Sequence, residues 1–268
     1  RGPAKRAHDA DGWAGIRFER ARTPSRGRTR GALVWSGVVT LRAVLWDLDG
    51  TLTDSVRFVV DTANRVIEAH GGSALEFESV GAMTGLPLEE IFRMAWPDLT
   101  PDLAQRYRTE YRDIYDREMI PATKLYDGAR ETLHAFHEAG LLQATVTGKR
   151  AADCERILRG LGIASEIDVY LGGDSVPRPK PAPDLAQHAM ARLRCAPGEC
   201  IVIGDANADI AMGKAAGART IQVLWGFARE RIDGADHVVG TWPDLRETVF
   251  ALAGRAHPIL RGGGALGS

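Results

Sequence analysis

The stretch Ala43-Val44-Leu45-Trp46-Asp47-Leu48-Asp49-Gly50-Thr51-Leu52 determines how the rest of the chain is interpreted. A short apolar run followed by a Gly-Thr turn is typical of a buried parallel strand. Open α/β sheets bind their ligands just outside the carboxyl ends of the strands. We therefore expect Asp47 and Asp49 to lie at the mouth of a site, and the paired carboxylates favour phosphoryl transfer there. A strand ending in solvated acids that cap the next helix is the simpler alternative.

Three later segments each supply a group that such a site needs. A second strand-like run over 141–146 ends at Thr147-Gly148, and Lys180 lies between two prolines that restrict the backbone around it. A third run over 200–204 ends at Asp205, with Asp209 four residues on. Taken singly, these residues could be a helix cap, a solvated loop and a helix start. Their joint occurrence in this order favours the functional interpretation.

The four segments closely resemble the four motifs of the haloacid dehalogenase-like hydrolases. They are Asp-x-Asp-Gly-Thr at 47–51, the strand-end Thr147, Lys180-Pro181, and Gly-Asp-x-x-x-Asp at 204–209. The resemblance runs from about residue 41 to about residue 252. Its nearest branch contains phosphoglycolate phosphatase and β-phosphoglucomutase, which carry a helical cap after the first motif. Gly148 stands where relatives mostly have Asn, and Trp46 where Phe is usual.

The resemblance implies a role for each of these residues. Asp47 would be the nucleophile that forms an aspartyl-phosphate, and Asp49 the general acid and base. Thr147, Gly148 and Lys180 would bind the phosphoryl oxygens. The metal ligands would be the Asp47 carboxylate, the Asp49 backbone carbonyl and Asp205, while Asp209 would hold a metal-bound water or orient its neighbours.

The residue types by themselves predict a cationic cofactor. Two like unit charges 4 Å apart repel by about 4 kcal/mol at an effective dielectric of 20. Several aspartates and a phosphate dianion therefore cannot share a pocket unless positive charge is brought in. Mg²⁺ prefers hard oxygen ligands and is usually held by one or two carboxylates together with substrate phosphate, so we expect it as the cofactor.

The alternation of elements predicts an α/β fold: a Rossmann-like parallel sheet with helices on both faces, plus a small all-helical cap domain inserted after the first strand. The catalytic core is expected at 39–53 and 125–254, and the cap at 54–124. Further strands are expected near 142–147, 167–171, 200–204 and 219–224, and core helices near 151–161, 182–193 and 207–216. Cap helices are expected near 56–69, 86–96 and 101–119. Thr84 and Gly85, in a loop resembling one that faces the site in relatives, are candidates for substrate selection.

Charge is unevenly distributed along the 268 residues. Ten Lys or Arg face three acids up to Arg42, which is +7, so the remainder carries −8 of the net −1. An acidic body argues against nucleic acid as the partner of the folded part. Residues 1–38 are expected to be a disordered basic extension, either an arm for nucleic acid or membrane or upstream sequence that folding does not need, and 255–268 a flexible tail.

Two features of the sequence predict where in the cell the protein is located. No stretch reaches the roughly 18 apolar residues of a membrane span. The three cysteines are an odd number in a chain too large to need disulfides, which favours the reducing cytoplasm. We therefore expect a cytoplasmic protein, a monomer or homodimer, that acts on a small molecule.

The expected function is a magnesium-dependent phosphatase that hydrolyses a small phosphate monoester: phosphoglycolate-like, a sugar phosphate or a biosynthetic intermediate. A phosphomutase of the β-phosphoglucomutase type uses the same motifs and is an alternative. A catalytically degenerate regulatory or interaction protein is an alternative of another class, although the intact acids and Lys180 count against it. Dehalogenation is least favoured, since relatives with that chemistry lack the second aspartate of the pair.

Overall fold

The computed structural model describes residues 40–81 and 88–255, all of which belong to one compact unit. The candidate selectivity residues Thr84 and Gly85 lie outside the described residues, as do the expected extension at 1–38 and nearly all of the expected tail.

A five-stranded parallel sheet forms the core, with strand order β4-β1-β5-β6-β7. Its strands are β1 (Ala43–Trp46), β4 (Leu142–Thr145), β5 (Cys200–Gly204), β6 (Arg219–Val223) and β7 (His237–Val239). The first strand lies between β4 and β5, with Trp46 opposite both Thr145 and Ile203. This arrangement brings the carboxyl ends of the three motif-bearing strands together.

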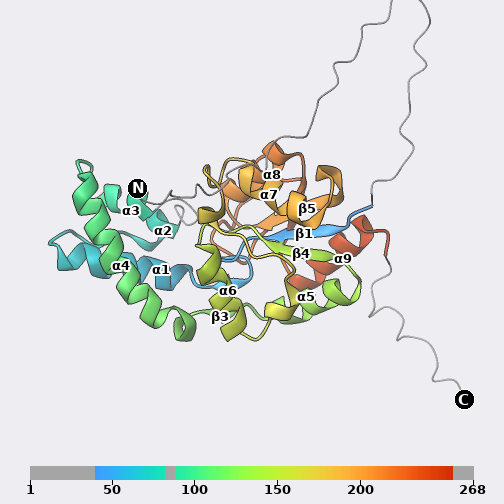
Figure 1. Cartoon of the computed structure of the whole chain (residues 1–268), viewed down its shortest axis with the longest axis horizontal. Coiled ribbons are helices and arrows are strands. Elements are labelled where there is room, and N and C mark those ends of the chain that lie inside the picture. The colour runs from blue at the N-terminus through green and yellow to red at the C-terminus, as the bar shows by residue number, and fades with distance from the viewer. Residues whose placement is uncertain (1–39, 82–87, 256–268) are drawn as a thin grey trace, which may run out of the picture. The chain divides into compact units, whose positions relative to one another are not determined.

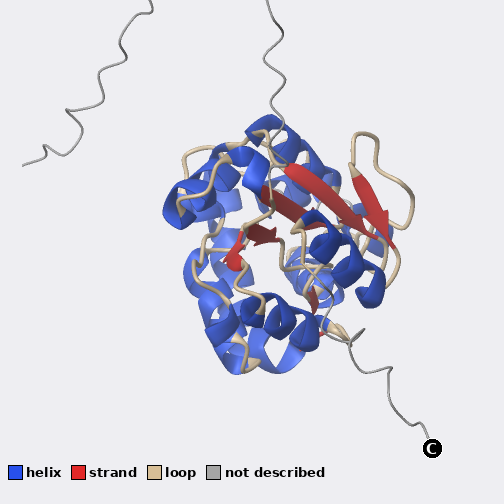
Figure 2. Ribbon diagram, turned by 90° about the vertical axis from the view of Figure 1, so that its right-hand side faces the viewer, coloured by secondary structure: helices blue, strands red, loops and turns tan. Residues whose placement is uncertain are grey.

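Helices cover both faces of the sheet (Figures 1 and 2). One face packs on α7 (Asp184–Leu193) and α8 (Asn207–Ala216), and the other on α5 (Ala129–Glu138) and α9 (Trp242–Leu252). Successive strand residues point to opposite faces, so β1 sends Val44 and Trp46 into one apolar cluster and Ala43 and Leu45 into the other. The predicted α/β fold class is confirmed.

The prediction of a strand at 167–171 was wrong. The segment forms an isolated bridge between Ala144 and Val169 instead of a strand, and the Asp168 amide donates to the Gln143 carbonyl at 2.8 Å. Beyond it, the Thr145 hydroxyl donates to the Leu171 carbonyl and accepts from the Leu171 amide, each at 3.0 Å. A side chain thus takes the hydrogen bonds that a neighbouring strand would supply, which ends the pairing after the bridge.

In the described part of the chain between β2 and β3, the helices are α1 (Val56–Ala69), α2 (Phe77–Gly81), α3 (Leu88–Ala95) and α4 (Pro101–Ala122). We call residues 56–122 the helical insertion. Helix α4 begins at a Thr100 cap, with Pro101 in the first turn where a missing N–H costs nothing. The chain leaves the core through β2 (Thr53–Asp54) and returns through β3 (Lys124–Leu125), and these two short strands pair antiparallel.

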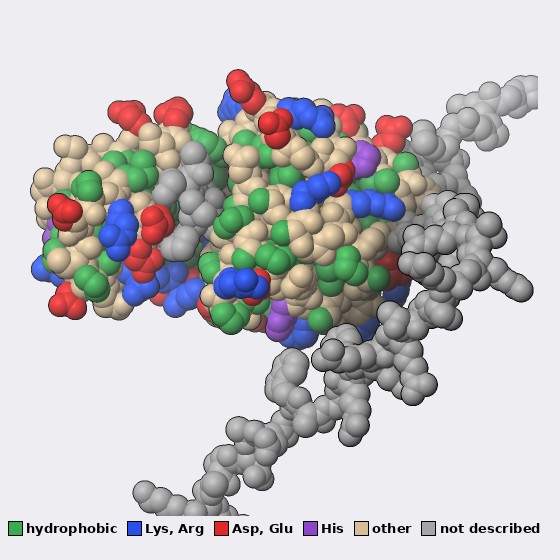
Figure 3. Space-filling model, turned by 90° about the horizontal axis from the view of Figure 1, so that it is seen from above, with side chains coloured by type: hydrophobic (Ala, Val, Ile, Leu, Met, Phe, Trp, Pro, Cys, Tyr) green, Lys and Arg blue, Asp and Glu red, His purple; other side chains and the backbone are tan. Residues whose placement is uncertain are grey.

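The view in Figure 3 shows Lys and Arg side chains interspersed with Asp and Glu, without a continuous basic patch on that face. Such mixing offers no track for a phosphate backbone there. Among the described helices, none is long and apolar enough to cross a bilayer.

Candidate active site

A cluster of buried carboxylates lies at the carboxyl edge of the sheet. The Asp47 amide donates to the Ile203 carbonyl at 2.9 Å, so the chain after β1 stays beside the chain after β5. One carboxylate oxygen from each of Asp47, Asp205 and Asp209 lies within 4.8 Å of the others. All three residues are at least 94% buried, since their exposed fractions are 6%, 2% and 1%.

Lys180 enters this cluster as its counter-charge. Its ammonium group donates to Asp47 Oδ1 at 2.6 Å and to Asp209 Oδ1 at 2.5 Å. Burial alone would lower the pKa of Lys180, but the two carboxylates outweigh burial and raise it, so the group stays charged. The other Asp209 oxygen accepts from the Ala206 amide at the start of α8. Asp209 is therefore both the helix cap of the simpler interpretation and a partner of the lysine.

The cluster holds more negative charge than Lys180 can balance. Burial raises the pKa of Asp47 well above its ordinary value, and the neighbouring carboxylates add to this against the pull of Lys180. Burial and Asp209 likewise raise the pKa of Asp205 to about 7. Buried hard oxygen donors that are short of positive charge fit a divalent cation such as Mg²⁺.

The Asp49 carboxylate turns away from the cluster. One oxygen accepts a short hydrogen bond from the Ser55 hydroxyl, and the other pairs with Lys149 Nζ at 2.9 Å. Asp49 thus contributes no carboxylate oxygen to the cluster described above, and its two oxygens are held by Ser55 and Lys149. The contacts of Ser55 and Lys149 with Asp49 were not predicted from the sequence. A basic residue two positions after the strand-end threonine could have indicated the second contact.

Thr147 and Gly148 follow β4 directly. The Val146 amide donates to the Trp46 carbonyl at 2.7 Å, which brings this segment alongside the start of the first motif. Thr147 is fully buried, and its hydroxyl accepts from the Lys149 amide at 3.3 Å. Gly148 lines the pocket described below.

The loop after β6 positions Asp205, and the sequence analysis missed it. The Phe227 amide donates to Asp205 Oδ2 at 2.6 Å. A Cβ atom on Gly226 would lie 2.3 Å from that oxygen and from the Gly50 carbonyl, and one on Gly50, where φ is +79°, would also meet Asp205 at 2.3 Å. Only glycine fits at these two positions. For Gly226 the requirement arises between distant segments, so no local pattern announces it.

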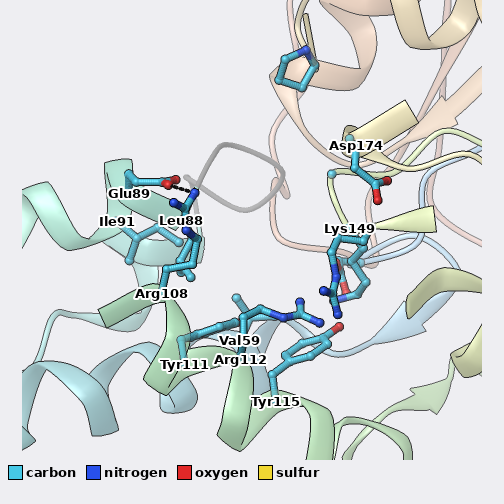
Figure 4. A pocket seen from close by; sticks show the side chains of 15 residues that line it. Val59, Leu88, Glu89, Ile91, Arg108, Tyr111, Arg112, Tyr115, Lys149 and Asp174 are labelled. Carbon is cyan, nitrogen blue, oxygen red and sulfur yellow. Dashed lines mark hydrogen bonds and ion pairs between the residues drawn. The ribbon is translucent and has the colours of Figure 1, made fainter. Parts of the chain in front are cut away.

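A pocket of about 410 Å³ opens beside Asp49. Gly148 and Lys149 line its core side, and Tyr111, Arg112 and Tyr115 of α4 line the opposite side (Figure 4). Lys149 Nζ lies 4.9 Å from the centroid of the Tyr115 ring. Core and helical insertion therefore both contribute to the space next to the candidate acid and base.

An α/β fold that presents an Asp-x-Asp pair, a buried lysine and a further aspartate at one sheet edge defines a phosphohydrolase-type site. The chain matches the haloacid dehalogenase-like hydrolase family over residues 44–223, more than half of its length. The chain belongs to this family.

Individual relatives and a solved structure show the same similarity. The phosphoglycolate phosphatase of Xylella fastidiosa (strain Temecula1) is 32% identical, with 72% of this chain and 84% of that protein covered. That of Vibrio parahaemolyticus is 30% identical, with 80% and 98% covered. The crystal structure titled a predicted phosphoglycolate phosphatase from Haemophilus somnus superposes with a TM-score of 0.72 at 22% identity, covering 79% of this chain and 99% of that one, and shows the fold.

The comparisons confirm the expected family, its phosphoglycolate phosphatase branch and the enzyme class, a phosphatase. The structure brings Asp47, Lys180, Asp205 and Asp209 together and sets Asp49, with Lys149, at the pocket. The catalytic and ligand roles of these residues remain predictions.

Proposed function

We propose that this enzyme is a magnesium-dependent phosphatase that hydrolyses a small-molecule phosphate monoester through an aspartyl-phosphate on Asp47. The observation that carries the proposal is the contact of Lys180 with both Asp47 and Asp209, inside a carboxylate cluster that is short of positive charge. The likeness to phosphoglycolate phosphatases supports the same chemistry.

The chain's own residues position the phosphoryl group. Lys180 holds the Asp47 carboxylate in one orientation and offers its remaining donor capacity to a phosphoryl oxygen. Thr147 and the backbone around Gly148, beside the first motif, are suited to bind other phosphoryl oxygens. Asp47, Asp205 and the Asp49 carbonyl would hold Mg²⁺, which when bound supplies positive charge against the phosphate. Catalysis then depends mostly on placement and charge, as in other phosphoryl transfers.

Asp49 moves the protons in this proposal. When Asp47 attacks phosphorus, the bond from phosphorus to the ester oxygen breaks, and protonated Asp49 donates to that leaving oxygen. The resulting carboxylate then takes a proton from the water that hydrolyses the aspartyl-phosphate, which returns Asp47 and releases phosphate. Ser55 and Lys149 fix the Asp49 carboxylate at the pocket, where the leaving group departs.

We further propose that the helical insertion, with the chain around it at 54–124, acts as the cap. Its helix α4 lines the pocket beside Asp49, and the paired β2 and β3 strands are the two connections to the core. A cap in this place excludes bulk water during the reaction.

The test is phosphate release by the purified protein. We expect hydrolysis of para-nitrophenyl phosphate with Mg²⁺ and its loss in EDTA, with restoration when Mg²⁺ is returned. A panel of metabolite phosphates, including phosphoglycolate and sugar phosphates, then ranks substrates by kcat/KM. Magnesium-independent turnover, or none with any ester, would contradict the proposal, and the second result would favour a catalytically degenerate member.

A further inference from the structure

The pocket beside Asp49 is the space for the leaving group. Its lining reaches Asp49 on one side, whereas Asp47, Lys180 and Asp205 are not among the residues that line it. The phosphoryl group would therefore lie at the carboxylate cluster and the rest of the substrate in the pocket. This assignment rests on the proposed phosphatase function.

The size of the pocket exceeds what a two-carbon leaving group needs. Its volume of about 410 Å³ lies within the roughly 300–1,000 Å³ range of pockets that enclose drug-sized ligands. At about 30 Å³ for each molecule of liquid water, it corresponds to about 14 waters. The glycolate released from phosphoglycolate would leave most of that space unfilled.

The lining of the pocket is mostly basic, with four cations, Arg108, Arg112, Lys149 and Arg150, against three acids, Asp49, Glu89 and Asp174. Outside the lining, Asp116 and Asp153 form ion pairs with Arg112, Arg150 and Arg156. The charges therefore balance over the whole group, while the surface that faces the pocket carries more cations than acids. The other two cations of the lining are matched singly, Lys149 by Asp49 and Arg108 by Glu89.

Two donors on α4 have no acceptor among the described residues. Arg112 is anchored through Nη2 to Asp116 and Asp153 at 3.0 and 2.8 Å, yet its buried Nε has no hydrogen bond. The Tyr115 hydroxyl is buried, in a residue only 2% exposed, and it interacts with the Lys149 ammonium, which is itself a donor, so the hydroxyl proton has no acceptor. Burial raises the pKa of Tyr115, so the hydroxyl keeps its proton.

The side chains of Arg112 and Tyr115 lie next to each other. The guanidinium carbon of Arg112 lies 4.9 Å from the centroid of the Tyr115 ring, and both side chains extend toward Lys149 in Figure 4. A buried donor without an acceptor is rare in native structures and calls for an explanation. An anionic oxygen of the substrate would supply the acceptor that both donors lack, and the mostly basic lining suits such a group.

We propose that the substrate carries a second anionic group, a carboxylate or a phosphate, on a leaving group larger than two carbons, and that Arg112 and Tyr115 bind this group. The preferred substrates are then phosphorylated sugar acids or sugar bisphosphates rather than phosphoglycolate. Arg112 supplies charge and a fixed planar donor edge, and Tyr115 supplies one neutral donor.

The experiment compares matched esters that differ only at the distal group, by kcat/KM with Mg²⁺. The carboxylate arm pairs 6-phosphogluconate with glucitol 6-phosphate, and the phosphate arm pairs fructose 1,6-bisphosphate with fructose 6-phosphate. We expect the charged member of at least one pair to exceed its neutral partner at least about tenfold, equivalent to about 1.4 kcal/mol, and to exceed phosphoglycolate. The arm that shows the preference identifies the anionic group.

Variants connect the preference to the residues. Arg112→Gln should reduce the charged-to-neutral ratio to about twofold or less, while Arg112→Lys should keep part of it because the charge remains. The matched control is Arg106→Gln, which changes an exposed arginine of the same helix that pairs with Glu110, and it should leave the ratio unchanged.

The outcomes separate this inference from the proposed function. Hydrolysis of para-nitrophenyl phosphate together with equal rates for charged and neutral partners in both arms, or with phosphoglycolate as the best substrate, would overturn the inference alone. Absence of phosphate release from every ester would overturn the proposed function and this inference with it. The comparison of matched esters uses the wild-type enzyme alone. The inference can therefore be overturned even if a variant fails to fold.

Discussion

The two sides of the site differ in how their charges are buried and paired. At the sheet edge, the buried Asp47, Asp49, Asp205 and Asp209 face, among the described residues, two ammonium groups, those of Lys149 and Lys180. Beside α4, Arg112, Arg150 and Arg156 pair with Asp116 and Asp153, and the side chains of Arg150 and Arg156 are nearly half exposed. Since an uncompensated buried charge is strongly unfavourable, the sheet edge suits a metal cation. The partly exposed and mostly basic lining of the pocket suits an anion.

The largest expected effect comes from removing the proposed nucleophile at the sheet edge. Asp47→Asn should lower kcat on the order of 10⁴-fold, because the amide cannot form the aspartyl-phosphate. Folding should persist, since burial already opposes the charge of this carboxylate. Steady-state kinetics and circular dichroism measure the two effects. Asp54→Asn, the same change at an exposed position nearby, is the control. Substantial activity in Asp47→Asn would contradict the nucleophile assignment.

A smaller effect is expected where the loop after β6 supports the cluster. In Gly226→Ala the new methyl group would lie 2.3 Å from Asp205 Oδ2, so the carboxylate or the loop must move. We expect a loss of about 1–3 kcal/mol of stability and a clear fall in kcat. Gly240→Ala, where nothing lies within 4 Å of the added atom, is the matched control. Equal kcat and Tm for the two variants would mean that the loop does not position Asp205.

On the insertion side, the Tyr115 hydroxyl offers a milder test. Tyr115→Phe removes only a hydroxyl whose proton has no acceptor among the described residues, so kcat/KM for the best substrate should fall about fivefold, in line with about 1 kcal/mol for one hydrogen bond. The melting temperature should change little, because the lost donor has no acceptor among the described residues and Lys149 keeps its ion pair with Asp49. Tyr170→Phe, whose hydroxyl bonds the Ala164 carbonyl, is the contrast and should lose stability without losing activity.

An effect of another kind is expected on stability as a function of pH. The pKa of Asp205 is about 7 in the folded protein against 3.8 ordinarily, so the folded state binds more protons between these values. The unfolding free energy of the metal-free protein should therefore fall as pH rises from about 4 to about 7. Added Mg²⁺ at a hundredfold excess over its Kd should restore about 2.7 kcal/mol near pH 8 and much less near pH 5.

Thermal denaturation at the two pH values, with EDTA or Mg²⁺, measures this difference. Asp205→Asn should flatten the pH dependence and reduce the stabilisation by Mg²⁺, because the titrating carboxylate is gone. An equal gain in Tm from Mg²⁺ at both pH values would argue against a cation at this cluster.

Much of the molecule was predictable from local patterns. The order of strands and helices, the cluster formed by Asp47, Lys180 and Asp205, and the helix at Val56–Ala69 were expected from apolar periodicity and from motif residues at strand ends. The strand expected at 167–171 was wrong because the Thr145 hydroxyl takes the hydrogen bonds of Leu171, a competition that the apolar pattern of the segment does not reveal.

By itself, the sequence determined the fold class and the sheet edge at which the motif residues meet, because a parallel sheet brings strand ends together whatever the details of its packing. Only the tertiary structure decided which residues complete the site. Lys149 on Asp49, Phe227 on Asp205, and Arg112 above Tyr115 all depend on side chains from separate elements meeting in space. Such contacts arise from the way the helical insertion and the core enclose one pocket, and no local spacing in the chain encodes them.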